Sequence, residues 1–458
     1  MKRIFVLMSV VALTAGVLRA EEPAATQPAA WKKLLNARKT DAISAAAKAT
    51  ALEVDRDLEA ARKLIAGDTS YRKMPGGWAD GSFVVTTRAG RQLKAKFHVR
   101  IPKGYDPEKS YPLLIIQHGI GGNGKKIGMV FQQTLGDAAD DYILLAPVLP
   151  GRHVMTMAPY QEQTVLGPLE WAKQNLNVND DRVFMTGYSL GGALTWHMGV
   201  MFPHQFAGVM PLAGLPKWEG QPYTDLMYFE NARYLPIHAI WGEDDNAEKP
   251  KLGVRTHCRR AAERLKELKN EKFRGTERPD AGHGDAWPTK QQLLDLLENH
   301  TRTVAPKELD WRFHLDNHSR AYWLKAIELA RKPVQFNRKL NIKLPAGVKP
   351  TKKAAAEAIT KYFRDALFTM QATVDKDTNT IRLTGKGIRK VRLELLDGML
   401  DYSKPVTLRY WSRKWTGKIP ASAECMLEHY ARTRDQTRRV VNVVDLSIFG
   451  RREVKYEE

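Results

Sequence analysis

Five short apolar runs constrain the fold of this chain more than any other feature of its sequence. They lie at residues 113–116, 142–145, 182–185, 208–210 and 237–240. The runs lack the alternation of apolar and polar residues that marks a strand with one solvent-exposed face. They are therefore typical of strands buried on both faces of a parallel sheet. Helical stretches lie between them, for example at 190–202 and 256–269. Strands that alternate with helices predict a doubly wound α/β domain.

Other patterns flank this α/β region. Runs at 83–85 and 96–101 predict an antiparallel pair of strands ahead of the parallel ones. Residues 31–67 are rich in Ala, Leu, Lys and Glu and predict one or two amphipathic helices that end at Gly67. Residues 351–370 can form a further helix.

Beyond residue 305 the apolar runs change character. At 380–384, 391–395, 406–410 and 440–444 apolar and polar residues alternate, as in half-solvated strands. We therefore expect a helical segment over 21–75, an α/β domain over 76–303, and an accessory domain over 304–458 that is mainly β.

The first 20 residues predict an export signal and not a structural element. Lys2 and Arg3 precede an apolar run over residues 4–18, which is too short to span a bilayer. Ala20 then offers a small residue at which a signal peptidase could cut. We expect a signal peptide over 1–20, no transmembrane segment, and a mature chain that is secreted or periplasmic. An uncleaved N-terminal anchor is the alternative.

Positive charge is concentrated in the last third of the chain. The formal net charge is +21, and residues 301–458 alone hold 33 Lys and Arg against 18 Asp and Glu. A stretch so different in charge is typical of a separate domain, and a basic surface favours anionic partners. The sequence has no zinc-finger spacing, no RNP-like run and no heptad zipper, so we do not expect nucleic acid as a partner. An anionic polysaccharide is the candidate partner. Four tryptophans could stack on sugars or pack in the core, and we favour the core: Trp311, Trp323, Trp411 and Trp415.

Cysteine usage adds little to the prediction. Cys258 and Cys425 are the two cysteines, which excludes a disulfide scaffold and a Cys-rich zinc module. They fall in different expected domains. Export would permit a disulfide between them, and two buried free thiols are the alternative.

The strongest chemical signal is the stretch Gly187-Tyr188-Ser189-Leu190-Gly191, which directly follows one of the buried runs and opens a helical stretch. A serine in a tight strand-to-helix turn must adopt a strained backbone, and glycines two residues before and after it leave room for that turn. The hydroxyl is then exposed at the carboxyl edge of the sheet, and the helix N-terminus behind it favours developing negative charge. We predict that Ser189 is a nucleophile.

A second glycine-rich loop, Gln117-His118-Gly119-Ile120-Gly121-Gly122, follows the run at 113–116. Such a loop supplies one backbone N–H of an oxyanion hole, and the residue after the serine supplies the other. We expect Ile120 and Leu190 to be these donors, with Gly121 as the alternative to Ile120. A plain glycine turn is the competing interpretation, and His118 is expected to be structural within its loop.

An acidic cluster and a histidine complete the pattern. Glu243, Asp244 and Asp245 follow the last buried run, where a carboxylate can accept the N–H of a histidine and fix its tautomer. His283 lies between two glycines, in a loop where its ring could take the proton from Ser189 and return it to the leaving group. Serine, then acid, then histidine is the chain order of α/β-hydrolases. These signals together predict a serine hydrolase.

In these motifs the chain resembles the secreted α/β-hydrolase esterases grouped with poly(3-hydroxybutyrate) depolymerases and feruloyl or acetylxylan esterases. The resemblance covers roughly residues 80–302, with the lead-in YDPEKSYPL from Tyr105, HG at 118, GYSLGG at 187, WGEDD at 241 and GHG at 282. It implies an α/β-hydrolase fold, a mostly parallel sheet with helices on both faces. It also implies that Asp245 is the acid and that Ile120 donates to the oxyanion. Asp244 beside Asp245 departs from the family pattern, so the choice of acid stays open.

The expected function is cleavage of carboxylic ester bonds through an acyl-enzyme formed on Ser189, with His283 and Asp245 completing the triad. Polysaccharide-linked esters or polyesters are the expected substrates, and we expect neither a metal nor an organic cofactor. A serine peptidase of the prolyl-oligopeptidase type is one alternative. A polymer-binding protein with a vestigial hydrolase core is another.

Overall fold

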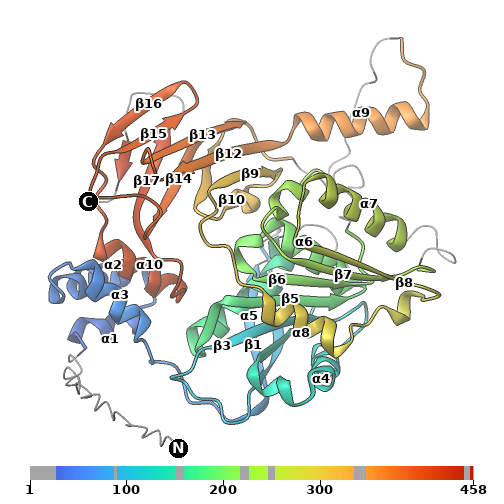
Figure 1. Ribbon diagram of the computed structural model, residues 1–458, viewed down its shortest axis with the longest axis horizontal. Coiled ribbons are helices and arrows are strands. Elements are labelled where there is room, and N and C mark those ends of the chain that lie inside the picture. The colour runs from blue at the N-terminus through green and yellow to red at the C-terminus, as the bar shows by residue number, and fades with distance from the viewer. Residues whose placement is uncertain are drawn as a thin grey trace, which may run out of the picture.

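The computed structural model describes residues 27–86, 90–149, 159–216, 226–245, 253–334, 344, 347–447 and 454–456. The expected export signal at 1–20 lies outside these residues. Figure 1 shows a small group of N-terminal helices, an α/β body and a β-rich part that holds the C-terminal strands. Among the described helices, none is both long enough and apolar enough to cross a membrane.

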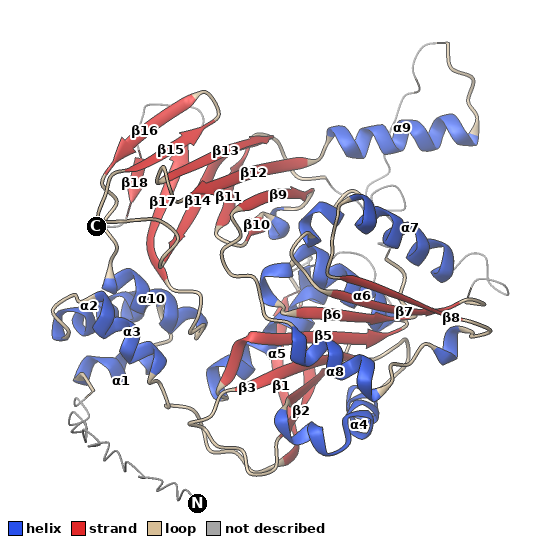
Figure 2. Ribbon diagram, in the orientation of Figure 1, coloured by secondary structure: helices blue, strands red, loops and turns tan. Residues whose placement is uncertain are grey.

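The α/β body is built on one eight-stranded sheet (Figure 2). Its strands in spatial order are β1 (Gly77–Thr86), β2 (Gln92–Ile101), β4 (Ile143–Pro147), β3 (Tyr111–Gln117), β5 (Val178–Tyr188), β6 (Gly208–Leu212), β7 (Ile237–Gly242) and β8 (Phe273–Arg278). The pairs β1–β2 and β2–β4 are antiparallel, and every pair from β4 to β8 is parallel. β3 and β4 are buried along their whole length, which explains their continuous apolar runs. This is the α/β-hydrolase fold that the sequence predicted.

Helices cover both faces of this sheet. α4 (Gly124–Leu135) and α8 (Lys290–Asn299) pack on one face, and α5 (Pro159–Asn175), α6 (Leu190–Met201) and α7 (Val254–Glu267) pack on the other. Every residue of α6 from Gly191 to Met201 is buried, as expected for a helix that is apolar on all sides. The helix that follows Ser189 is therefore held by packing around its whole circumference.

Two five-stranded sheets form the β-rich accessory part. One has the order β10 (Arg320–Ala321), β11 (Leu324–Leu329), β14 (Ile388–Leu396), β17 (Val440–Ser447) and β18 (Val454–Tyr456). The other has the order β16 (Arg413–Gly417), β15 (Val406–Tyr410), β13 (Thr380–Lys386), β12 (Phe368–Asp375) and β9 (Glu308–Phe313). Apolar side chains from both sheets share one core, as in a β-sandwich.

The helix expected over 351–370 is shorter than predicted. α9 (Lys352–Asp365) ends at Asp365, and β12 begins three residues later at Phe368. Phe368 and Met370 are buried while the residues between and after them are half-buried, so the period of two that defines a strand starts here. The apolar residues at the end of the expected helix are thus the first core positions of a strand.

The N-terminal segment forms three helices, not the one or two expected: α1 (Ala29–Asn36), α2 (Thr40–Glu53) and α3 (Leu58–Ala66). The break before α3 has a local cause. Asp55 and Arg56 both have positive φ angles, and the Asp57 side chain caps α3 by accepting the backbone N–H groups of Glu59 and Ala60. α3 is followed by Gly67 as its C-cap, at the predicted end.

These three helices pack mainly on α10 (Ala423–Thr433), a helix of the accessory part that the sequence did not predict. Trp31 stacks on Tyr430 with ring centroids 5.8 Å apart, and both side chains are buried. The Tyr430 hydroxyl donates to Asp68, which also pairs with Arg434 at 2.8 Å. The N-terminal helices and α10 therefore share one hydrophobic cluster.

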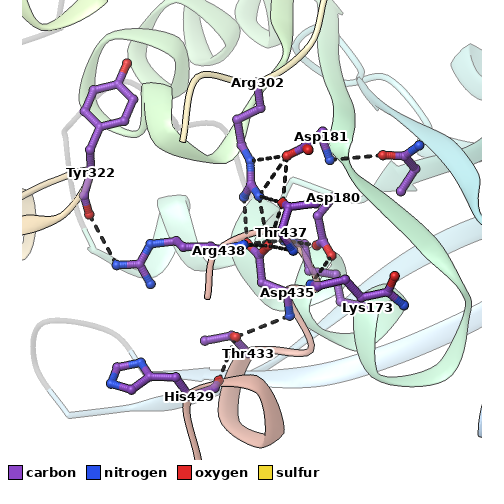
Figure 3. A network of polar contacts seen from close by, with 12 residues as sticks. Lys173, Asp180, Asp181, Arg302, Tyr322, His429, Thr433, Asp435, Thr437 and Arg438 are labelled. Carbon is purple, nitrogen blue, oxygen red and sulfur yellow. Dashed lines mark hydrogen bonds and ion pairs between the residues drawn. The ribbon is translucent and has the colours of Figure 1, made fainter. Parts of the chain in front are cut away.

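Buried ion pairs join the accessory part to the α/β body (Figure 3). Arg302 donates to both carboxylate oxygens of Asp435, at 2.7 and 2.9 Å, and also to Asp181. Lys173 of α5 lies 2.7 Å from Asp180 and 3.8 Å from Asp435. Because a buried charge is costly when it loses its partner, this network holds the two parts in one arrangement.

Candidate active site

Ser189 stands in a strained turn between β5 and α6. Its backbone has φ 56° and ψ −113°, and its N–H donates to the carbonyl oxygen of Leu212 at 2.8 Å. A Cβ atom at Gly187 would lie 2.5 Å from the Gly191 oxygen, and one at Gly191 would lie 2.3 Å from the Gln117 oxygen. Both glycines are therefore needed so that the turn can pack against itself and against β3, as the motif predicted.

His283 lies beside this serine. Its Nε2 is 2.8 Å from the Ser189 Oγ, although 94 residues separate the two along the chain. The ring sits on the short 3₁₀ turn η4 (His283–Asp285), where Asp285 accepts the N–H of Gly282 at 3.0 Å. The His283 side chain is 39% exposed, so a substrate can reach it.

Asp245 completes the hydrogen-bond chain at the end of β7. Its two carboxylate oxygens lie 2.9 and 3.0 Å from the His283 Nδ1, and its side chain is only 5% exposed. Asp244 is exposed, and its backbone N–H bonds the Ala281 oxygen. Glu243 is half-buried, and its backbone bonds Arg278 and Arg255. The geometry thus selects Asp245 from the three candidates that the sequence left open.

The glycine-rich loop after β3 packs directly on the nucleophile turn. A Cβ atom at Gly119 would lie 3.3 Å from the Ser189 Cβ. The next residue, Ile120, is exposed, and Leu190 is the first residue of α6, so its N–H has no acceptor within the helix. The loop and the helix start are therefore both adjacent to the serine. That the N–H groups of Ile120 and Leu190 bind an oxyanion stays a prediction.

His118 holds this loop in place. Its Nδ1 lies 2.7 Å from the Gly119 oxygen, and its Nε2 accepts the Leu149 N–H at 3.0 Å. A ring that donates at Nδ1 and accepts at Nε2 is neutral, and burial lowers the pKa of His118 in agreement with that state. The side chain has the structural role that the sequence suggested.

Two aromatic residues near the histidine were not singled out from the sequence. The Tyr188 hydroxyl donates to the His283 carbonyl oxygen at 2.8 Å, and burial raises the pKa of Tyr188, which keeps the hydroxyl protonated. The Tyr188 ring stacks on Trp287 at 4.7 Å. Tyr188 immediately precedes the serine in the motif, which is the one signal that could have drawn attention to it. Both rings support the loop that carries His283.

The tryptophans and cysteines of the earlier predictions lie mostly in cores. Trp311 and Trp323 are buried, and their indole N–H groups donate to the backbone oxygens of His318 and Pro306. Packing therefore accounts for these two residues. Trp411 and Trp415 are half-buried at the edge of the same core. Cys258 and Cys425 are both buried, and no disulfide joins them.

Residues 153–285 match the family described as Phospholipase/Carboxylesterase. The chain is 27% identical over 179 residues to the endo-1,4-beta-xylanase Y of Acetivibrio thermocellus, a match that covers 34% of this chain and 16% of that protein.

Among solved structures, the chain is similar to a thermostable esterase, with 22% identity and a TM-score of 0.40 over 49% of this chain and 63% of the other. It is also similar to a poly(3-hydroxybutyrate) depolymerase from Bordetella parapertussis, with 17% identity and a TM-score of 0.36 over 49% of this chain and 90% of the other. At these sequence identities and TM-scores, the solved structures do not indicate a substrate for this chain.

The matched segment contains Ser189, Asp245 and His283. The family match and the sheet topology agree with each other: the α/β body has the α/β-hydrolase fold, and the segment that bears the serine has the sequence signature of phospholipases and carboxylesterases.

Proposed function

We propose that this protein is a serine hydrolase that cleaves carboxylic esters through an acyl-enzyme. One observation carries the proposal: Ser189 Oγ, the His283 ring and the Asp245 carboxylate form a continuous chain of contacts at 2.8, 2.9 and 3.0 Å. This chain of contacts favours an active enzyme over a polymer-binding protein with a vestigial hydrolase core. The family match over residues 153–285 supports an ester as the bond that is broken.

The reaction follows from the geometry. Asp245 accepts the Nδ1–H of His283, so Nε2 carries the lone pair that removes the proton from Ser189. The serine oxygen attacks the ester carbonyl carbon, and the N–H groups of Ile120 and Leu190 stabilise the oxyanion. His283 then gives its proton to the alcohol as the acyl-enzyme forms. Water, activated by the same ring, releases the acid and restores the serine.

The finer proposal concerns the substrate: an acyl group linked to a polysaccharide. Its support is the similarity of part of the chain to a protein named as a xylanase. The accessory part also carries a row of like charges, since Arg382 is paired with Arg409 across β13 and β15, and Arg409 with Lys414 across β15 and β16. All three side chains are exposed. Like charges placed opposite one another weaken a sheet, so the row is better explained by an anionic polymer than by stability.

Labelling and a panel of substrates test the reaction. A fluorophosphonate probe should label the wild-type protein, and Ser189→Ala should abolish both labelling and the hydrolysis of aryl acetates while leaving the melting temperature unchanged. An alanine variant with full activity would refute the role of Ser189. Turnover of peptide anilides but not of aryl esters would favour the peptidase alternative. Acetyl, butyryl, feruloyl and long-chain esters then define the acyl preference.

The polymer contact has its own test. Arg409→Gln should weaken salt-sensitive binding to an anionic xylan or pectin and leave kcat on small esters unchanged. Thr416→Gln, at a nearby exposed position on β16, is the matched control. Equal binding by wild type and both variants would contradict the polymer contact without touching the proposed reaction.

We also propose that the protein is exported, on the strength of the charged start and apolar run at residues 1–20. N-terminal sequencing of the mature protein from the periplasm or medium should begin near Glu21. Retention of the full-length chain in the membrane fraction would instead favour the uncleaved anchor.

A further inference from the structure

Three metal-ligating side chains converge in the interior, apart from the Ser189 triad. They are Glu162 of α5, His197 of α6 and His318 of the 3₁₀ turn η5 (Asp316–His318), and one ligand atom of each lies within 4.8 Å of the others. All three residues are buried. Because 35 and 121 residues separate them along the chain, no local spacing in the sequence marks the cluster.

The atoms that face one another are those a metal ion would use. The Nε2 atoms of His197 and His318 lie 2.8 and 2.5 Å from the same oxygen, Oε1 of Glu162. At these distances each ring N–H donates to the same carboxylate oxygen, so Glu162 serves as the common acceptor of both rings. Two imidazoles and one carboxylate are a ligand set typical of zinc.

The surroundings of the cluster support a bound ion. Asn317 donates to the second Glu162 oxygen at 2.7 Å, which orients the carboxylate and leaves Oε1 for the ion. The His318 Nδ1 is buried and has no hydrogen-bond partner among the described residues. Without an ion, the Nε2 atoms of both histidines face the carboxylate and donate to it. A bound metal displaces these protons, and the His318 proton can move to Nδ1, which leaves Nε2 with a lone pair for the ion. Ligands around tetrahedral zinc stand about 3.3 Å apart, so the two distances from the Glu162 oxygen to the ring nitrogens need to grow by less than about 1 Å.

We propose that Glu162, His197 and His318 bind one Zn²⁺ ion that ties the accessory part to the α/β body. His197 lies eight residues beyond Ser189 on α6, about 12 Å along the helix axis, so the ion does not reach the reacting ester. Its role is structural: it joins α5 and α6 to the turn that precedes β10 of the accessory part.

Metal binding by the full-length protein tests this directly. After dialysis against a chelator, the wild-type protein should take up one equivalent of Zn²⁺ and melt at a higher temperature, and Co²⁺ should give the intense visible absorption of a tetrahedral site. His318→Asn and Glu162→Gln should each weaken Zn²⁺ binding about 100-fold or more and remove the thermal shift.

The control is His283→Ala, which removes a different carboxylate–histidine pair, that of His283 with Asp245, and should keep the full equivalent of Zn²⁺. The proposal is overturned if the folded wild-type protein binds no Zn²⁺, if both cluster variants bind it as well as the wild type, or if the control loses it. Should a cluster variant fail to fold, the Co²⁺ spectrum of the wild type decides, since an octahedral spectrum would refute the site.

Discussion

Replacing Asp245 with asparagine should lower kcat about 10⁴-fold, the loss seen when a triad acid becomes an amide. The His283 Nδ1 faces both carboxylate oxygens at 2.9 and 3.0 Å, so the amide nitrogen of asparagine would be presented to it in at least one orientation. The ring would then accept at Nδ1 and carry its proton on Nε2, where it cannot remove the proton from Ser189. Four powers of ten correspond to about 5.4 kcal/mol of barrier.

The matched control is Asp244→Asn, one residue away and exposed. It should stay within about twofold of wild type, since the backbone and not the side chain of Asp244 bonds the His283 loop. Both variants are assayed by release of 4-nitrophenol from its acetate, with active sites counted by a fluorophosphonate probe. Equal losses in the two variants, or an Asp245→Asn enzyme within tenfold of wild type, would refute the assignment.

Three further changes probe the scaffold. Gly191→Ala places a Cβ atom 2.3 Å from a backbone oxygen of β3, so it should lower the free energy of unfolding by about 1–3 kcal/mol and remove most of kcat. Gly284→Ala is the control, because a Cβ atom there meets open space beside the same site. It should keep the melting temperature and kcat of the wild type. Burial lowers the pKa of His314 to about 4 in the folded protein, against about 6.5 in the unfolded chain. The folded state therefore favours the neutral ring, so the free energy of unfolding should be at its full value above pH 6.5 and fall by up to about 3 kcal/mol as the pH drops toward 4. Urea titrations should show a weaker dependence on pH for His314→Gln. Arg302→Met removes the close bidentate partner of the buried Asp435 and leaves it only Lys173, 3.8 Å away, as a counter-charge. It should cost about 3–5 kcal/mol in the same assay, and an unchanged midpoint would show that the network in Figure 3 contributes nothing.

The catalytic candidates could be predicted because each has a local signature. Gly187 and Gly191 mark the turn at Ser189 through backbone sterics, and flanking glycines mark the loop of His283. The choice between Asp244 and Asp245 could not be read in the same way. It depends on which side chain points back toward η4, and the structure decides it through contacts between β7 and a loop 38 residues away.

The accessory part was harder to predict because its signals are weak and depend on tertiary contacts. β9 and β11 were missed, and their buried residues alternate with charged ones, as in Trp311-Arg312-Phe313. α10 is stabilised by packing against helices nearly 400 residues earlier in the chain, which no local pattern reports. The cluster of Glu162, His197 and His318 was missed for the same reason, since it exists only once both parts have docked.

The place where the two parts dock limits what the accessory part can do for catalysis. Asp180 and Asp181, at the start of β5, and Lys173, near the end of α5, lie at the amino edge of the sheet, whereas Ser189 follows β5 at the carboxyl edge. Eight residues of strand separate the two edges, or about 26 Å. A contact network at the amino edge does not contribute to the oxyanion site or the triad. If the row of basic residues around Arg409 binds a polymer, it therefore acts by holding that polymer near the enzyme. Removing these basic side chains should raise KM for polymeric substrates while kcat for small esters stays the same.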